Sequence, residues 1–328
     1  MQAQPAEDKG VQRPLLTGPK RHHFLPQFYL EGFTQGGLVA VYDRELNEFR
    51  SQQPINTGVI GHFYTVQDAD GRRRYEIEAM LSDFESKATP IVEKLADGKQ
   101  IDDDERANLA IFVALAAMRT PDVIDSLKLF KEAHVLDTAK RLYTDVEDVA
   151  ADMRQNPEYA GLSDETILED ARFMVDMAQN GGCKVEVDHT WAVKMAIDLA
   201  FKVAPLLAGR DWMVFIRECD KKSFITTDAP VVLTSEGTSA DSFYGIGYGS
   251  ADAIVLFPLT ESSMLVMCGN GGNLKWIAAN ADTVRQLNLT VASRCQRFIV
   301  GRDESLLRSL AEYLGLASKK WQPKLQAR

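Results

Sequence analysis

Residues 109–118 read LAIFVALAAM, ten consecutive apolar residues. A helix that is apolar on every side is typical of a protein interior, because it has no face to turn toward water. The stretch from Asp102 to Glu105 just before it is acidic, which favours a helix start through the positive end of the helix dipole. Pro121 marks a boundary after it. The sequence therefore predicts a buried helix that begins near Asp102 and ends before Pro121.

Further helices are expected on both sides of this one. An apolar stripe at helical spacing precedes it and ends at Asp97-Gly98, a typical helix end. Pro90 lies inside the stripe, so we expect a kink or a break there. The stripe consists of Ile77, Leu81, Phe84, Ala88, Ile91 and Leu95. Downstream helices are predicted at about residues 122–143, 164–179 and 187–208.

Strand signals lie outside this helix-rich middle. Residues 38–42 predict a strand, 43–47 a turn and 48–51 a returning strand, whereas 56–66 are irregular. After Gly209, short β-favouring runs alternate with turns, which indicates a largely antiparallel sheet. These runs are residues 212–216, 223–227, 231–233, 253–257, 264–267 and 298–300, with helices at about 279–293 and 303–314. Residues 269–273, GNGGN, are interpreted as a tight β-turn.

The order of these elements predicts an α+β fold. It has a small N-terminal β element, a helix-rich middle and a mainly antiparallel C-terminal sheet with late helices. Because the middle helices can fold onto the sheet, we favour a single domain at residues 21–316 over two domains. Residues 1–20 are interpreted as a disordered arm and residues 317–328 as a tail.

Composition narrows the classes of function. The 328 residues are 45% hydrophobic, which suits one large or two modest globular domains. A net charge of -10 argues against a protein that coats DNA without regard to sequence, although a local basic patch inside a cleft is compatible with it. The four cysteines are far apart and form no CxxC pair, which excludes a zinc ribbon and a disulfide framework and favours reduced thiols.

The expected location follows from the apolar runs. The first twenty residues are polar and lack the apolar segment of a signal peptide. No apolar run reaches the roughly 18 residues of a membrane span. We therefore expect a cytoplasmic protein that does not contact a membrane. The sequence does not indicate an oligomeric state.

Two adjacent histidines, His22 and His23, stand where the polar N-terminal stretch becomes apolar. Pro26 fixes the local backbone, and aromatic residues such as Tyr29 anchor the segment, so a histidine here can be held firmly as a general base or a ligand. The other interpretation is a surface or hydrogen-bonding histidine. His23 alone has the spacing to Pro26 and Tyr29 and is the candidate base, whereas His22 is assigned to the surface.

Glu78 and Glu85 are seven residues apart, which is two helical turns, so they share one side of the predicted helix. Two interpretations remain open for this pair. The carboxylates either form a solvated boundary of the helix, or they face a cleft as metal ligands or as an acid and a base.

Arg119 and Asp228 are the remaining candidates. Arg119 ends the apolar helix, and because an unpaired buried guanidinium is costly, it either forms a structural salt bridge or clamps a phosphate or carboxylate. Asp228 lies between two strand-like runs, before Ala229-Pro230. It is either a turn former or a ligand or general base at the mouth of a strand.

Several of these residues follow one another in a family pattern. In order along the chain they are His23-x-x-Pro26-x-x-Tyr29-Leu30, Phe33, His62-Phe63-Tyr64, Glu78, Glu85, Arg119-Thr120-Pro121 and Thr227-Asp228-x-Pro230. With them the chain resembles, over about residues 20–300, the mostly bacterial domain-of-unknown-function family 4238. The family pattern often has serine at the position of Thr227, a change that keeps a hydroxyl. The resemblance supports the choice of residues, and the family name assigns no reaction.

These candidates together suggest a metal-dependent hydrolase, such as a nuclease or phosphodiesterase, with a nucleic acid or nucleotide as substrate. In this hypothesis Glu78, Glu85 and Asp228 bind a divalent metal, Mg²⁺ or Mn²⁺, while His23 is the base and Arg119 stabilises charge. The alternative is a non-enzymatic binding or regulatory module. In it the same polar residues form a structural network that locks the N-terminal segment onto the sheet.

Overall fold

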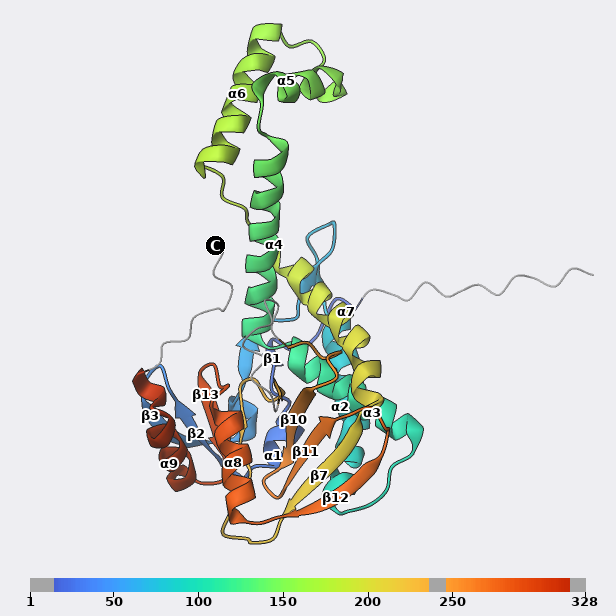
Figure 1. The fold of residues 1–328 in the computed structure, drawn as a ribbon, viewed down its shortest axis with the longest axis vertical. Coiled ribbons are helices and arrows are strands. Elements are labelled where there is room, and N and C mark those ends of the chain that lie inside the picture. Colours follow the sequence, from blue (N-terminus) through green and yellow to red (C-terminus); the bar gives the residue numbers. More distant parts are fainter. Residues whose placement is uncertain (1–14, 236–245, 319–328) are drawn as a thin grey trace, which may run out of the picture. The chain divides into compact units, whose positions relative to one another are not determined.

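The computed structural model describes residues 15–235 and 246–318 of the chain. These residues divide into two compact units: the first comprises 15–121 and 196–318, and the second comprises 122–195 (Figure 1). The fold is mixed α+β, with small N-terminal sheets, central helices and a mostly antiparallel C-terminal sheet with late helices, as the sequence predicts. The single domain, the arm and the tail stay predictions, and residues 1–14 and 319–328 lie outside the described residues.

The N-terminal part forms short strands and one short helix. The predicted hairpin at 38–51 is present, because β2 pairs antiparallel with β3. Residues 56–66, expected to be irregular, contribute β4, which pairs antiparallel with β1. The elements are β1 Arg21–His23, α1 Gln27–Glu31, β2 Val39–Asp43, β3 Glu48–Gln52, η1 Pro54–Asn56, β4 Val59–Gly61, β5 Val66–Gln67 and β6 Arg73–Arg74.

Two helices, α2 (Glu76–Ala96) and α3 (Asp103–Met118), follow. α3 begins with a capping box, in which the side chains of Asp102 and Glu105 each accept a hydrogen bond from the backbone N–H of the other residue. Most of its apolar residues are buried, which confirms the predicted core helix. α2 continues through Pro90, so of the predicted kink or break the break is wrong, and the kink stays a prediction. Burial of its apolar stripe offsets the backbone hydrogen bond that a proline removes.

The larger sheet has five strands in the order β12-β7-β11-β10-β9. Its strands are β7 Asp211–Arg217, β9 Val232–Ser235, β10 Ala253–Thr260, β11 Ser263–Cys268 and β12 Leu274–Ala279. All neighbours are antiparallel except β12, which the sequence pattern did not indicate and which lies parallel to β7. Residues 269–273 therefore do not close a hairpin. The Asp211 carboxylate instead accepts hydrogen bonds from the N–H groups of Gly271 and Asn273.

A smaller sheet joins N-terminal and C-terminal strands in the order β3-β2-β13-β8. Of the strand predicted at 223–227 only β8 (Thr226–Thr227) forms, and β13 (Phe298–Gly301) lies where a strand is predicted. The late helices α8 (Ala281–Ala292) and α9 (Glu304–Leu314) contact this sheet, and η4 (Leu316–Ser318) follows (Figure 1). Both sheets contribute to one apolar core, which includes Tyr42, Phe224, Leu256, Ile299 and Leu307.

The second unit is helical. It contains most of α4 (Pro121–Leu142), then α5 (Val146–Gln155), η2 (Pro157–Tyr159), α6 (Asp164–Asn180) and the first part of α7 (His189–Ala208). The three helices predicted here are present, whereas α5 was not predicted. α5 and α6 pack through a small apolar cluster of Val149, Ala150, Met153, Ile167 and Ala171. Within the described ranges, no single helix has the length and apolarity to cross a membrane; α3 and α4 pass that test only as a bent pair, by length and composition.

Candidate functional site

Arg119 lies at the end of α3 and is the centre of a buried polar cluster. Its side chain is 2% exposed, and its Nη1 lies 2.8 Å from Oε1 of Glu85 on α2. The Tyr64 hydroxyl donates to the Arg119 backbone carbonyl at 2.9 Å, which fixes the end of α3 against the segment that follows β4. The structure therefore shows the salt bridge that was one of the two predicted roles of Arg119.

The other edge of the guanidinium has no such partner. Among the described residues, Nε and Nη2 of Arg119 form no hydrogen bond, although both atoms are buried. These two groups lie along one edge of the guanidinium plane, the edge that binds a carboxylate or phosphate through two parallel hydrogen bonds. Buried donors without an acceptor are costly, so this edge of Arg119 leaves part of its hydrogen-bonding capacity unused among the described residues.

Glu78 lies on the same side of α2 as Glu85, two turns earlier, and it carries the most perturbed carboxyl group of the cluster. Burial and then the negative charge of Glu85 raise the pKa of Glu78 to about 7, against the opposing effect of Arg119. A carboxyl group with a pKa near neutrality is present in both its acidic and its basic form, as a general acid or base requires. The side chains of Glu78 and Glu85 are 20% and 24% exposed, so the cluster meets solvent on their side.

His22, and not His23, is the histidine that belongs to this cluster. Its side chain is fully buried, so its assignment to the surface is wrong. Its Nδ1 accepts a hydrogen bond from the Tyr64 backbone N–H, and its Nε2 lies 2.9 Å from the Pro19 carbonyl, to which it donates. Burial lowers the pKa of His22, so the ring is neutral and its 3.7 Å approach to Glu78 is not an ion pair.

His62 adds a strained backbone to the same region. It has a φ of 54°, in the left-handed region that residues other than glycine rarely adopt. Its ring lies 6.3 Å from that of His22, and its Nδ1 has no hydrogen-bond partner within the described part of the chain. Strained and unsatisfied groups of this kind collect at binding and catalytic sites. We call Arg119, Glu85, Glu78, His22, His62 and Tyr64 the Arg119 cluster.

Two predicted site residues lie elsewhere. In β1 successive side chains point to opposite faces, and Nε2 of His23 lies 3.2 Å from the Ile55 carbonyl. Asp228 follows β8, and its carboxylate accepts three backbone hydrogen bonds, from the N–H groups of Gln296, Arg297 and Phe298. The structure therefore brings Glu78, Glu85 and Arg119 together, but not His23 or Asp228.

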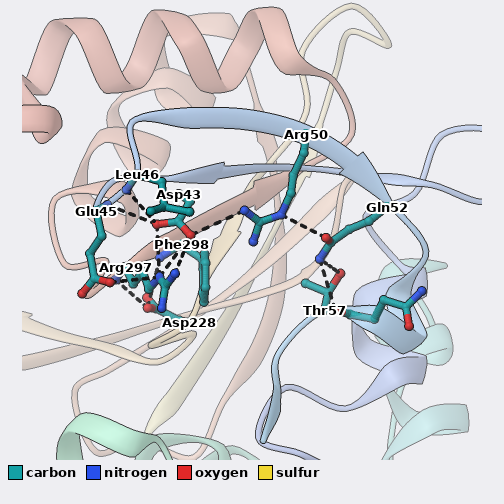
Figure 2. A network of polar contacts seen from close by, with 10 residues as sticks. Asp43, Glu45, Leu46, Arg50, Gln52, Thr57, Asp228, Arg297 and Phe298 are labelled. Atoms are coloured by element: carbon teal, nitrogen blue, oxygen red, sulfur yellow. Dashed lines mark hydrogen bonds and ion pairs between the residues drawn. The ribbon is translucent and has the colours of Figure 1, made fainter.

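Asp228 belongs to a second polar network, which holds the smaller sheet together (Figure 2). Next to it, Arg297 donates to both carboxylate oxygens of Asp43, a fully buried residue at the end of β2, at 2.9–3.1 Å. Burial raises the pKa of Asp43, but the hydrogen bonds and charge of Arg297 outweigh it, and the pKa is lowered. Every carboxylate oxygen of Asp43 and Asp228 therefore accepts at least one hydrogen bond from the protein.

The predicted metal ligands are therefore not assembled into one site. Within residues 15–235 and 246–318, no three or more histidine, cysteine, aspartate or glutamate side chains form a group that could hold a metal ion. Glu78 and Glu85 remain as two carboxylates in one cluster. From the sequence, His22 was assigned to the surface, and His62 and Tyr64 were given no site role although both stand in the family pattern. Side chains alternate between the two faces of β1, so His22 and His23 point in opposite directions. This alternation would have indicated a buried His22 only if residues 59–61 had been predicted as the partner strand β4.

The raised pKa of Glu78 predicts a pH-dependent effect of Glu78→Gln. The unfolded group has its usual pKa of 4.5 and the folded group a pKa of about 7. The folded state therefore binds more protons in this range, and the wild type loses stability as pH rises from 4.5 through 7. Glutamine does not titrate, so the variant should gain about 3 kcal/mol over the wild type between pH 4.5 and 8.

Urea unfolding of both proteins at several pH values measures this difference. Glu93→Gln is the control, because Glu93 is exposed on the same helix. If the free energies of unfolding of the wild type and of Glu78→Gln change with pH in parallel, the pKa of Glu78 does not account for the pH dependence.

Comparisons with known proteins agree with the family resemblance. A family model described as protein of unknown function DUF4238 matches residues 21–305. The search of curated proteins found no match, and the search of solved structures found none either. The family match covers the β1–β4 pair, both helices of the Arg119 cluster, the second unit and both sheets. The chain therefore belongs to the DUF4238 family.

Proposed function

We propose that the chain is a hydrolase that acts on a phosphodiester or a nucleotide at the Arg119 cluster. The observation that carries this proposal is the buried edge of Arg119, formed by Nε and Nη2, with no hydrogen-bond partner among the described residues. Two phosphate oxygens fit that edge as they fit other arginine forks. Glu85 holds the opposite side of the guanidinium, so the fork is fixed before a ligand arrives.

The reaction proposed is attack of water on phosphorus. Glu78 takes a proton from the water as its oxygen bonds to phosphorus, and the bond from phosphorus to the ester oxygen breaks. The proton then passes from Glu78 to the leaving oxygen, so that the products are a phosphomonoester and an alcohol and Glu78 is regenerated. Arg119 neutralises the negative charge that grows on the phosphoryl oxygens. His22 positions the segment of Tyr64 and does not move a proton, because both ring nitrogens are engaged.

The proposal retains a divalent metal ion, Mg²⁺ or Mn²⁺, and the activity test adds each of them. Mg²⁺ is commonly held by one or two carboxylates together with substrate phosphate oxygens, and Glu78 and Glu85 are two carboxylates beside the proposed phosphate position. Asp228 is not among the proposed metal ligands, because it lies in the other polar network. A chain with a net charge of -10 also favours a nucleotide or a short ester over a long nucleic acid.

The activity test uses nucleotides, cyclic nucleotides, dinucleotides and an aryl phosphodiester, each with Mg²⁺, with Mn²⁺ and with a chelator. Arg119→Lys keeps the charge beside Glu85 but loses the fork, and it should lower kcat/KM by about 100-fold. Glu78→Gln should lower kcat by a similar factor with little change in KM. His23→Ala is the control and should turn over like the wild type, since His23 contacts the Ile55 carbonyl instead.

Two results contradict this proposal. One is no turnover of any of these substrates by the wild type, and the other is equal turnover by the wild type and Arg119→Lys. Turnover lost in His23→Ala but kept in Glu78→Gln would return the role of base to His23.

A non-enzymatic module is the second candidate function, and the state of His22 favours it. Both ring nitrogens of His22 are hydrogen-bonded, and the ring ties β1 to the segment of Tyr64 as a structural residue would. In a binding module, phosphate or a nucleotide is not turned over, and it raises the thermal midpoint with the logarithm of its concentration once that concentration exceeds the dissociation constant. In a purely structural network, neither ligand changes the midpoint.

A further inference from the structure

The second unit has a groove between its short helices. The groove has a volume of about 300 Å³, a size that suits a small ligand, and it is lined by the end of α4, by α5 and by α6. All of its lining residues belong to the second unit. The Gln179 side chain on α6 donates hydrogen bonds of 2.8 Å to the carbonyls of Lys140 and Tyr143, so α6 is attached to the end of α4. The walls of the groove are therefore held to one another.

Aromatic and methionine side chains form much of the lining. Tyr143, Tyr159 and Met174 line the groove and pack against the apolar cluster of α5 and α6. Met153 belongs to that cluster and lines the groove as well. Aromatic rings attract ammonium ions through the negative face of the ring, and the flexible thioether of methionine adapts to apolar groups of different shapes. This lining therefore suits a ligand with an apolar surface.

The charge around the groove is strongly negative. Residues 144–180 contain ten acidic and two basic residues, and one of the two basic residues, Arg154, pairs with Asp164. Asp148 and Asp152 line the groove, and because they are four residues apart they present their carboxylates on one side of α5. Among the described residues that line the groove, none is basic. A ligand therefore needs a positive charge as well as an apolar surface.

We propose that this groove binds a small organic cation, an ammonium ion with apolar substituents. The charged nitrogen lies beside Asp148 and Asp152, and the substituents contact Met153 and Met174. An inorganic cation suits the groove less well, because within residues 15–235 and 246–318 no three acidic, histidine or cysteine side chains form a group that could hold a metal ion. The proposal uses no residue of the Arg119 cluster, and it stands or falls separately from the proposed hydrolase activity.

NMR spectra of the full chain, labelled with ¹³C at the methionine methyl groups, test this proposal. The probe is benzyltrimethylammonium, added at constant ionic strength. The signals of Met153 and Met174 should shift and saturate, because both residues line the groove. Met213 and Met264 lie in the larger sheet of the first unit, and their signals should stay in place. Absence of a saturable shift at Met153 and Met174 overturns the proposal.

Two further probes separate the charge from the apolar surface. Tetramethylammonium has the charge without the ring, and benzyl alcohol has the ring without the charge. Each should bind at least about fivefold more weakly than benzyltrimethylammonium. Equal binding of tetramethylammonium would show only an acidic surface, and equal binding of benzyl alcohol would show that the carboxylates contribute nothing. Either result contradicts the proposal.

The decisive variant is Asp148→Asn with Asp152→Asn, which should weaken binding of benzyltrimethylammonium at least about fivefold. Its matched control is Glu165→Gln with Glu169→Gln. This pair also removes two exposed carboxylates four residues apart, and Glu165 lies in the first turn of α6 as Asp148 lies in the first turn of α5. Neither glutamate lines the groove, so the control should bind like the wild type. Unchanged binding in the Asp148 and Asp152 variant overturns the proposal, and so does an equal loss in the control.

Discussion

Replacing Arg119 with methionine should lower the free energy of unfolding by about 3–5 kcal/mol, because removing one partner of a buried ion pair strands the other. Arg119 is almost fully buried and pairs with Glu85, while Glu78 lies close enough for its pKa to respond to both. Without the guanidinium, Glu85 loses its ion-pair partner and Glu78 loses a positive charge that lowers its pKa. Chemical unfolding of the purified variant measures the loss.

Two companion variants separate this explanation from simple loss of packing. Arg119→Met combined with Glu85→Gln should recover part of the lost stability, because no carboxylate is then stranded. Arg154→Met removes an exposed arginine from its pair with Asp164 on the second unit, and it should cost at most about 1 kcal/mol. A loss in Arg119→Met no larger than that in Arg154→Met contradicts the buried-pair explanation.

Replacing Asp228 with alanine should cost about 3–4 kcal/mol, because three backbone N–H groups lose an ionised acceptor at once. These groups belong to Gln296, Arg297 and Phe298, where β13 begins. Without the carboxylate the start of β13 loses its attachment to the chain that follows β8. Amide hydrogen exchange should therefore accelerate in β13 before the rest of the sheet.

The control for this prediction is Asp220→Ala. The Asp220 side chain is fully exposed in the turn after β7, so its loss should change stability by less than about 0.5 kcal/mol. Equal stability of the two alanine variants would show that the three hydrogen bonds contribute little. A catalytic or metal-binding Asp228 would instead lose activity while the fold kept its stability.

Local patterns were enough to predict much of the fold. The buried helix at 109–118, the acidic start at Asp102 and the hairpin at 38–51 all depend on neighbours in sequence, and all are present. β12 and α5 were missed. β12 was hidden because the glycine-rich run at 269–273 resembles a hairpin turn, whereas Asp211, some sixty residues earlier, holds this loop so that β12 reaches the far side of β7.

The candidate site was predictable where helical spacing decided it. Glu78 and Glu85 share a helix face, and Arg119 at the end of the next helix reaches Glu85. His22 and Asp228 were not predictable in this way. The face of β1 that points inward is set by its pairing with β4, and the partners of Asp228 lie about seventy residues further along the chain. The proposed roles of the site residues stay predictions.

The pairing of β2 with β13 also sets an order of events during synthesis. β2 ends at Asp43, and its second neighbour, β13, begins at Phe298. Until the ribosome has released β13, the hairpin of β2 and β3 has one open edge, with the apolar side chains Val39, Ala40, Val41 and Tyr42 uncovered. Such an edge can pair with other chains, so aggregation competes with folding until β13 is available to cover it. The ion pair between Arg297 and Asp43 joins the two strands where β13 begins and β2 ends.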